Sequence, residues 1–309
     1  MSGQPPLRFG NAPCSWGTIE GFGQGIPYDR MLDELKETGY EGSELGDFGY
    51  MPTDPERLRE AFLERGLVLL GGFVGVPLTE KEEHGPGEAH AVRTAALMAA
   101  LADLDPGWKP LLVLADAHSR DPVRFQRAGR IRPEERLEEE RWQTLALGIR
   151  RIAQAVGAAA GLETVFHFHA ASYVETPEEI DRLVELTGIP LVFDTGHYLY
   201  GSGALEGEVV LEGLRRLMPF VRYVHFKDLD PRVAERARRE GWDYKKAVGQ
   251  GLFCELGRGA IDFGRVARFL VDQGYRGFVT VEQDVLPGMG TPKESALRSR
   301  IYLRQVTGW

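Results

Sequence analysis

Short apolar runs alternate with longer amphipathic segments along the whole chain. This alternation is typical of a parallel sheet whose strands are joined by helices. The runs predict eight strands, at residues 7–12, 42–45, 68–73, 111–115, 164–168, 191–194, 223–226 and 278–282. The amphipathic segments predict helices at residues 28–38, 55–65, 90–104, 138–156, 177–186, 209–217, 263–273 and 294–304. Strands that are each followed by a helix predict an α/β fold of the (β/α)8 or TIM-barrel type, with residues 1–309 as a single domain.

Several predicted helices have recognisable ends. Thr176 and Pro177 precede two glutamates, as expected for an N-cap, a proline at the first helical position and an acidic first turn. Glycines stand just past four predicted helices, at Gly39, Gly66, Gly188 and Gly274. A glycine is the usual residue at that place, because helices commonly end in a left-handed conformation.

Two loops are longer than a regular barrel needs. The first covers residues 118–136, and the second is an insertion at about residues 229–258 after the seventh strand. The second loop contains a charged helical piece at residues 231–241 and a glycine-bearing stretch at residues 249–251. Long loops after barrel strands form the rim of the site, so each is either a lid or solvated surface.

Composition and charge narrow the class of protein. Hydrophobic residues make up 43% and charged residues 27% of the chain, which is typical of a globular protein. The net charge of -9 argues against a nucleic-acid or anionic-membrane partner, because such binding depends on Lys and Arg. Two cysteines, Cys14 and Cys254, do not suggest a disulfide framework, and the first residues lack the apolar run of a secretory signal. We therefore expect a cytoplasmic protein.

Polar residues end three consecutive apolar strands near the carboxyl end of the chain. They are Asp194 in FDTGH, His225 in VHFKD and Glu282 in VEQD. The carboxyl ends of barrel strands meet at the active-site face, so these side chains are expected on one side of its mouth. Together they form an oxygen and nitrogen ligand set for a divalent metal, although each taken alone can be an ordinary strand-end or helix cap.

The fifth predicted strand adds two histidines. His167 and His169 alternate in HFHAASYVET, so both face the same side of the strand. If that side is the barrel interior, both approach the site; otherwise they are hydrogen-bonded core histidines. Glu175 follows a few residues later in the loop and is a further carboxylate within reach of a metal.

These motifs resemble a known family over essentially the whole chain. The residues that carry the resemblance lie at 11–17 (NAPCSWG), 39–46 (GYEGSELG), 166–176 (FHFHAASYVET), 193–197 (FDTGH), 224–228 (VHFKD) and 281–284 (VEQD). They resemble the sugar phosphate isomerase/epimerase superfamily, which has a xylose-isomerase-like barrel, and within it the inosose dehydratases. NAPCSWG, the HFH pair and EQD favour the dehydratases.

The resemblance implies a divalent metal, Mn²⁺ or Co²⁺ in first place, with Mg²⁺, Fe²⁺ or Zn²⁺ as alternatives. The superfamily usually holds its metal with Glu, Asp, His and Glu, which implies ligand roles for Asp194, His225 and Glu282. This sequence departs from the pattern at the fifth strand, where His167 stands at or near the place of the usual Glu. The fourth ligand is therefore His167 or Glu175.

Chemistry of the inosose dehydratase type removes water from a cyclic keto-polyol. Its difficult step takes a proton from the carbon beside a ketone, and a divalent ion on the carbonyl would stabilise the resulting enolate. A general base and a general acid must then lie within reach. The candidates for these catalytic roles are Lys227, His197, Glu44 and Glu175.

Three further residues are candidates for contact with a small polyhydroxylated substrate. They are Trp16, His169 and Gln283. Trp16 follows the first strand and offers an apolar wall for the C–H face of a sugar, although a tryptophan is more often part of the core. His197 lies beyond a glycine, which is expected to free the turn after Asp194.

Other functions remain open on the same fold. A ketose epimerase or isomerase would use the same metal site, but epimerases of this superfamily are expected to need a pair of carboxylates. A 3-dehydroshikimate dehydratase would need a cation for its carboxylated substrate, which Arg120, Arg124 or Arg127 can supply.

A repair endonuclease on this fold is disfavoured, because the chain has only seven histidines and an acidic composition. A non-catalytic sugar-binding barrel is the alternative outside catalysis, and a homo-oligomer, dimer or tetramer, is expected for such barrels.

Overall fold

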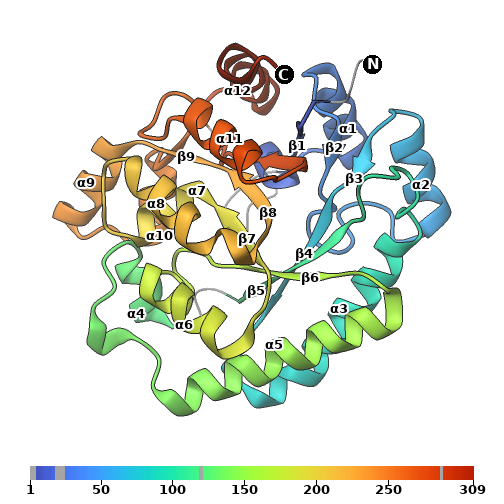
Figure 1. Cartoon of the computed structure of the whole chain (residues 1–309). Helices are drawn as coiled ribbons and strands as arrows, with labels where there is room; N and C mark the ends of the chain where they lie inside the picture. The colour runs from blue at the N-terminus through green and yellow to red at the C-terminus, as the bar shows by residue number, and fades with distance from the viewer. Residues whose placement is uncertain (1–4, 18–24, 118–120, 286–287) are drawn as a thin grey trace.

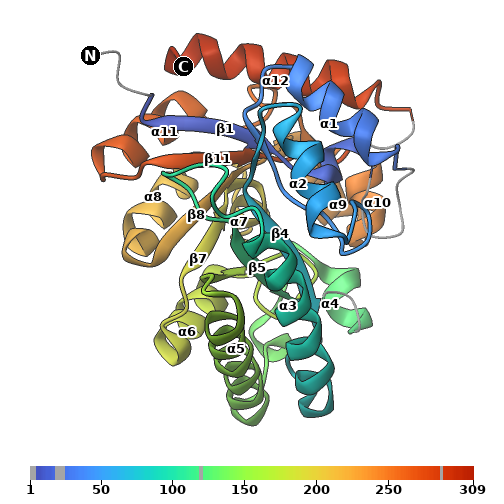
Figure 2. The ribbon, with the colours of Figure 1, turned by 90° about the vertical axis from the view of Figure 1, so that its right-hand side faces the viewer.

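The computed structural model describes residues 5–17, 25–117, 121–285 and 288–309. Its main sheet is parallel and curls into a barrel with helices around it (Figures 1 and 2). In chain order its strands are β1 (Leu7–Asn11), β2 (Gly42–Ser43), β3 (Val68–Leu69), β4 (Gly71–Val76), β5 (Leu111–Asp116), β6 (Thr164–His167), β7 (Leu191–Asp194), β8 (Val221–Phe226) and β11 (Gly277–Val281). Every predicted strand is present, so the predicted α/β barrel is confirmed.

The third predicted strand closes the barrel, because its two parts pair with the strands at the two ends of the sheet. It appears as two short elements, because β3 pairs with β2 while β4 pairs with β5. Leu70 joins them and takes part in both ladders, since its N–H donates to Ser43 O and its carbonyl accepts from Leu111 N. The ring of hydrogen bonds therefore passes through a single bent strand, as in an eight-stranded barrel.

Helices cover the outside of the barrel, and two long ones, α3 and α5, lie side by side (Figure 2). The α-helices are α1 (Tyr28–Glu37), α2 (Pro55–Leu63), α3 (His84–Ala99), α4 (Pro122–Arg127), α5 (Glu139–Ala160), α6 (Pro177–Thr187), α7 (Thr195–Gly201), α8 (Glu208–Leu217), α9 (Pro231–Glu240), α10 (Tyr244–Gly249), α11 (Phe263–Asp272) and α12 (Pro292–Thr307). Short 3-10 helices are η1 (Pro13–Trp16), η2 (Lys81–Glu83), η3 (Pro133–Glu135) and η4 (Met218–Phe220). Thr176 caps α6 as predicted, and the four predicted C-cap glycines have positive φ angles.

One helix begins earlier than predicted. α3 starts at His84 instead of residue 90 and includes the segment GPG at residues 85–87. The proline lies in the first turn, where its missing N–H has no helical partner to lose. A Cβ at Gly87 would lie 2.5 Å from Val76 Cγ1, so this glycine allows the helix to approach β4 closely.

The inside of the barrel is apolar over part of its length. Buried side chains inside it include Leu70, Val113, Tyr223 and Phe278, with Trp108 packed edge-on against Phe278. A separate cluster packs the outer faces of the strands against the helices. Because the amino-terminal half of the barrel is filled, a substrate site is left to its carboxyl-terminal end.

Two long loop insertions, called the first and second excursions, lie at that end of the barrel, on the left in Figure 1. The first excursion, residues 121–137, contains α4 and η3, while the start of the predicted loop at His118 lies outside the described residues. The second excursion, residues 229–258, contains α9, α10 and the strand β10 (Phe253–Cys254), which pairs antiparallel with β9 (Asp228–Leu229).

The second excursion is fastened at its base by one carboxylate. Both oxygens of the buried Asp228 accept backbone N–H groups, from Leu229, Gly257, Gly259 and Ile261, at 2.9 to 3.2 Å. This clamp holds the two ends of the excursion together.

In the part of the chain that the structure describes, no helix has the length and apolar character needed to span a membrane.

Candidate metal centre and cavity

Four side chains from neighbouring strands converge at the carboxyl-terminal mouth of the barrel. His167 ends β6, Asp194 ends β7, His225 lies in β8 and Glu282 follows β11. One ligand atom from each lies within 4.8 Å of the others, and all four residues are buried. The arrangement follows from the parallel ladders, in which Asp194 is the register partner of His225. These are the four residues that the sequence indicated as ligands, with His167 rather than Glu175 in the group.

Hydrogen bonds fix which nitrogen of each histidine faces the group. His167 Nδ1 lies 2.6 Å from the carbonyl oxygen of Phe168, so Nδ1 carries the hydrogen and Nε2 keeps its lone pair. His225 Nε2 lies 2.8 Å from Glu44 Oε1, so Nε2 donates to Glu44 and Nδ1 is the nitrogen that faces the group. His167 Nε2 and His225 Nδ1 both lie on the side of Asp194, at 4.0 Å and 3.8 Å from Asp194 Oδ2.

Two buried polar atoms of this group have no hydrogen-bond partner among the described residues. They are Asp194 Oδ2 and His225 Nδ1, of which His225 Nδ1 forms an ion pair with Glu282 Oε1 at 3.1 Å. Such orphaned atoms are uncommon, because a buried polar group without a partner costs free energy. The second oxygen of Asp194 is satisfied, since Oδ1 accepts from the backbone N–H of His197 at 2.8 Å. These atoms and His167 Nε2 gather around one place, which fits a divalent cation that takes the place of the proton on His225.

The surroundings of the group favour the unprotonated forms of His167 and Glu282. Burial, followed by the positive charge of His225, lowers the pKa of His167 to about 3 and keeps it neutral. Burial favours the neutral form of Glu282, but His225 and Lys227 outweigh it and hold its pKa well below the ordinary value. Burial raises the pKa of Asp194 to about 7, and its charged form is the one that a cation would stabilise.

His225 is the exception, because carboxylates surround it. Burial opposes its charged form, yet the carboxylates of Glu282 and Glu44 outweigh burial and raise its pKa to about 10. The imidazole is therefore protonated in the metal-free protein. A metal ion must displace this proton to reach Nδ1.

A second polar group lies directly beside the four ligands. Lys227 Nζ lies 3.2 Å from Glu282 Oε2, 3.4 Å from Asp284 Oδ1 and 3.5 Å from His197 Nε2. Burial opposes its charge, but Asp284 and Glu282 raise the pKa of Lys227 well above the ordinary value. Lys227 is thus an ammonium group held over the metal centre.

Asp284 belongs to this group although it was not among the predicted site residues. It is 5% exposed, and burial raises the pKa of its carboxyl group. Its spacing of two from Glu282 in VEQD was the available signal. The strand β11 ends at Val281, however, so the period of a strand did not extend to this position.

His169 and His197 stack beside Lys227 with ring centroids 3.8 Å apart. His197 Nδ1 accepts from the backbone N–H of Ala170 at 3.2 Å, so its Nε2 carries the hydrogen. His169 Nδ1 lies 2.7 Å from the carbonyl of Ala170, so its Nε2 is the acceptor. By their hydrogen bonds, His197 Nε2 is therefore assigned as a donor and His169 Nε2 as an acceptor, and the two rings lie side by side.

Gly196 has a different role from the one expected. Its φ angle is not positive, so the turn after Asp194 does not need the freedom of a glycine. Instead, a Cβ there would lie 2.7 Å from Lys227 Cγ. Gly196 leaves the room that Lys227 occupies beside His197.

A cavity of about 760 Å³, which includes open volume at its mouth, joins these groups. Its walls are formed by Ala12, Pro13, Cys14, Glu44, Gly46, Asp47, Phe73, His167, His169, His225, Lys227, Tyr244, Val248, Glu282 and Asp284. Polar side chains gather around the metal centre, while Phe73, Tyr244 and Val248 give an apolar wall. The cavity opens to solvent, and its mixture of polar and apolar walls suits a small polyhydroxylated molecule.

Glu175 does not join the metal ligands. Its oxygens each accept a backbone N–H at 2.6 Å, one from Gly129 and one from Ala171. Ala171 is the one non-glycine residue with positive φ in the described chain, and this bond holds it in that conformation. Glu175 thus ties the first excursion to the loop after β6, which corrects the expectation of a catalytic or ligand role.

Two predicted substrate-binding residues also point elsewhere. Trp16 is fully buried, and its Nε1–H donates to Glu34 at 2.9 Å, so it belongs to the packing under α1. The side chain of Gln283 accepts from the Ser295 hydroxyl, toward α12. Neither residue is among those that line the cavity, so the structure does not bring them into the site.

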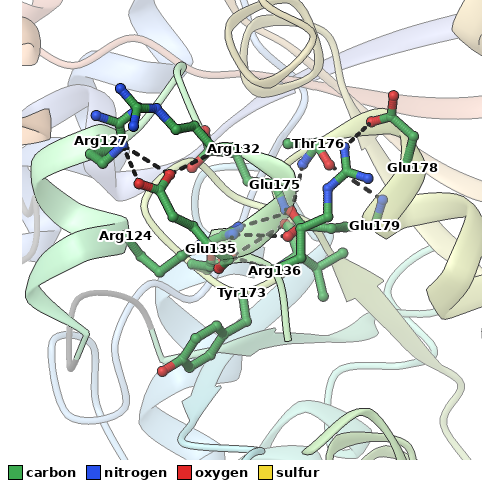
Figure 3. A network of polar contacts seen from close by, with 12 residues as sticks. Arg124, Arg127, Arg132, Glu135, Arg136, Tyr173, Glu175, Thr176, Glu178 and Glu179 are labelled. Carbon is green, nitrogen blue, oxygen red and sulfur yellow. Dashed lines mark hydrogen bonds and ion pairs between the residues drawn. The ribbon is translucent and has the colours of Figure 1, made fainter. Parts of the chain in front are cut away.

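The arginines proposed for a carboxylated substrate are engaged in the first excursion (Figure 3). Arg124 is 1% exposed and forms two 2.8 Å bonds to Glu179. Arg127 pairs with Glu135 at 2.6 Å. Arg120 lies outside the described residues. Neither of the two described arginines lines the cavity.

Comparisons with known proteins agree with this fold. Residues 32–305 match the family described as xylose isomerase-like TIM barrel. The chain is 34% identical to an inosose dehydratase of Geobacillus kaustophilus (strain HTA426), over 97% of this chain and 95% of that protein. It is 30% identical to an inosose dehydratase of Clostridium perfringens (strain 13 / Type A), over 97% and 98% of the two chains. The solved structure of IolI protein with a binding zinc atom superposes with a TM-score of 0.69 at 15% identity, over 97% and 98% of the two chains. The chain therefore belongs to the xylose isomerase-like TIM barrel family, and within it to the family of the inosose dehydratases.

Proposed function

We propose that this protein is a metal-dependent hydro-lyase that removes water from a cyclic keto-polyol, with scyllo-inosose as the substrate to test first. The observation that carries the proposal is the convergence of four ligand atoms within 4.8 Å, directly beside the Lys227 ammonium. The names of the curated relatives at 34% and 30% identity support the same reaction.

His167, Asp194, His225 and Glu282 are the residues we propose to hold the metal. Two imidazoles and two carboxylates suit Mn²⁺, Co²⁺, Fe²⁺ or Zn²⁺ better than Mg²⁺, which prefers an all-oxygen site. We propose Mn²⁺ or Co²⁺ as the native ion. When bound, the ion supplies a positive charge that makes the proton beside the substrate ketone more acidic. Glu44 orients His225 through the bond to Nε2 and is in our proposal a positioning residue.

The remaining polar groups are suited to proton transfer and binding of oxygen. His169 Nε2 is the acceptor that we assign to the proton on carbon. Lys227 Nζ and His197 Nε2 are both donors and lie 3.5 Å apart, so a substrate oxygen within reach of both receives two hydrogen bonds. We propose that Lys227 and His197 bind the departing hydroxyl group of the substrate. Lys227 donates a proton to this hydroxyl, which leaves as water. Asp284 and Glu282 keep the ammonium in place.

An epimerase is the nearest alternative, and one observation argues against it. The fourth member of the ligand group is the neutral imidazole of His167, where the expected epimerase pattern has a carboxylate. A 3-dehydroshikimate dehydratase is also less well supported, because Arg124 and Arg127 pair with Glu179 and Glu135 instead of facing the cavity. A non-catalytic sugar-binding barrel would not need an ammonium group and two oppositely protonated histidines beside its metal centre.

We propose that the protein acts in the cytoplasm, as a homo-oligomer such as a dimer or tetramer, without nucleic-acid or membrane partners. The net charge of -9 supports the last point.

Product analysis tests the proposed reaction. The metal-loaded protein is incubated with scyllo-inosose, and the products are identified by NMR, beside D-fructose and 3-dehydroshikimate as alternative substrates. We expect an unsaturated or diketo ring that has lost one molecule of water, formed only from scyllo-inosose. A product of unchanged mass with one inverted carbon would instead identify an epimerase.

A further inference from the structure

The cavity has two chemically different sides. His169, Lys227 and Asp284 lie toward the metal centre, whereas Tyr244 and Val248 bring apolar surface from the second excursion. Tyr244 and Val248 stand four residues apart on α10, so they share one face of that helix. A polyol ring carries its hydroxyl groups around its edge and C–H groups on its faces. A cavity with one polar and one apolar side therefore matches a ring better than an open chain.

Tyr244 is held firmly in its place. It is 4% exposed. Its ring lies edge-on to His169, with centroids 5.7 Å apart at 72°, and edge-on to Phe125, with centroids 6.1 Å apart at 76°. One of these neighbours belongs to the barrel mouth and the other to the first excursion, so Tyr244 joins the two excursions above the site.

Phe125 is fixed in turn by the residue before it. The Arg124 guanidinium donates to both oxygens of Glu179 at 2.8 Å, and its Nε donates to Ser172 O at 2.8 Å (Figure 3). Glu179 also accepts the N–H groups of residues 175 and 176 before α6. A buried, bidentate ion pair of this kind has one favoured geometry, so it fixes the backbone of the first excursion at the position from which Phe125 reaches Tyr244.

Side chains of the first excursion also donate hydrogen bonds to backbone carbonyls of the second excursion. Gln126 Nε2 donates to Gly241 O at 3.0 Å, and Arg130 Nη2 donates to Trp242 O at 2.7 Å. The wall carried by α10 is therefore assembled before any ligand enters.

We propose that Tyr244, together with Val248, is the surface against which the ring of the cyclic substrate packs, and that Phe125 is a positioning residue that holds Tyr244 there. The pair of excursions thereby selects a ring over an open-chain keto-sugar. This inference rests on the proposed function, because it names the feature of the substrate that the same site selects.

Calorimetric binding to the metal-loaded protein tests this selection with two probes that do not react. The probes are myo-inositol, which is a ring, and D-glucitol, an open chain with the same number of hydroxyl groups. The wild type is expected to bind myo-inositol more tightly, and Tyr244→Leu to weaken that binding about tenfold with little change for D-glucitol. Tyr244→Phe keeps the ring and is expected to keep the preference, and Val248→Ala to reduce it.

Turnover of scyllo-inosose by Phe125→Leu tests the positioning role. We expect KM to rise severalfold while kcat and metal affinity stay close to wild type, because Phe125 acts on the wall alone. Phe269→Leu is the matched control, since Phe269 is also half-buried but lies on α11 and does not line the cavity. A loss of kcat together with metal affinity in Phe125→Leu would overturn the positioning role.

The outcomes separate this inference from the proposed function. A wild type that binds myo-inositol but does not convert scyllo-inosose would overturn the proposed reaction and leave the Tyr244 wall supported. Equal affinity for myo-inositol in the wild type, Tyr244→Leu and Val248→Ala would overturn the wall. A wild type that prefers D-glucitol would overturn it as well.

Discussion

At the scale of single residues, the site depends on how each histidine is oriented by its neighbour. Carbonyl oxygens fix the hydrogens of His167 and His169 on Nδ1, whereas a backbone N–H fixes that of His197 on Nε2. The sequence motif HFH indicated that two histidines share a side of the strand. It could not indicate these tautomers, because the atoms that fix them belong to turns formed only in the folded chain.

The bond between Glu44 and His225 predicts an effect on metal binding. Glu44→Ala is expected to weaken the affinity for Mn²⁺ or Co²⁺ about 10- to 100-fold, because the imidazole loses the acceptor that orients it. Competition with a coloured chelator measures this affinity without any turnover. Glu41→Gln, at a half-exposed position that pairs with Arg8, is the control. Unchanged affinity in Glu44→Ala would contradict the positioning role.

Lys227 carries the second prediction at this scale. Lys227→Met is expected to lower kcat by at least about 100-fold while the protein still binds its metal, because the departing hydroxyl loses its proton donor. Steady-state kinetics and metal analysis on the same sample measure both effects. If kcat stays within a few-fold of wild type, another group donates the proton.

At the scale of elements, prediction succeeded where periodicity is strong and failed where tertiary contacts decide. The strand at residues 68–73 was predicted as one element, but its bend at Leu70 results from pairing with β2 on one side and β5 on the other. Helix α7 directly follows Asp194 and was not predicted, because its sequence TGHYLYG lacks an amphipathic period. The resemblance to a family supplied the ligand set. The places that Glu175 and Gln283 take in the structure could not be predicted, because sequence does not show which way a loop side chain turns.

The buried pair that anchors the first excursion gives a prediction for stability. Glu179→Gln is expected to lower the free energy of unfolding by about 3 to 5 kcal/mol, because it leaves the charge of Arg124 buried without its partner. Denaturant unfolding measures the change. Glu178→Gln is a matched control, since Glu178 is exposed and its pair with Arg136 is expected to contribute less than about 1 kcal/mol. Equal effects of the two substitutions would refute the proposed anchor.

At the scale of the whole molecule, burial of carboxyl groups makes stability depend on pH. Burial raises the pKa of Glu175 from its ordinary value to about 7. The folded state therefore binds more protons than the unfolded state between these two values, and its stability falls as the pH rises through that window. The contribution of the neutral Glu175 is fully present below the ordinary carboxyl pKa and is lost above about pH 7.

The fall of stability with rising pH can be measured by comparison with Glu175→Gln, whose side chain cannot ionise. From about pH 5 to about pH 7 the wild type is expected to lose about 2 kcal/mol more unfolding free energy than the variant. Denaturant titrations of both metal-free proteins at each pH give the difference. A difference that is flat with pH would contradict the raised pKa.

The central claim for the whole molecule is that the four-residue group holds the metal on which loss of water depends. The most direct measurement is the turnover of scyllo-inosose, followed by the absorbance of the conjugated product, while Mn²⁺ is titrated into metal-free protein beside Asp194→Asn. We predict a rate that rises from near zero until about one ion is bound per chain, and no comparable rise in Asp194→Asn. Full turnover in the metal-free protein, or turnover that survives in Asp194→Asn, would contradict the claim.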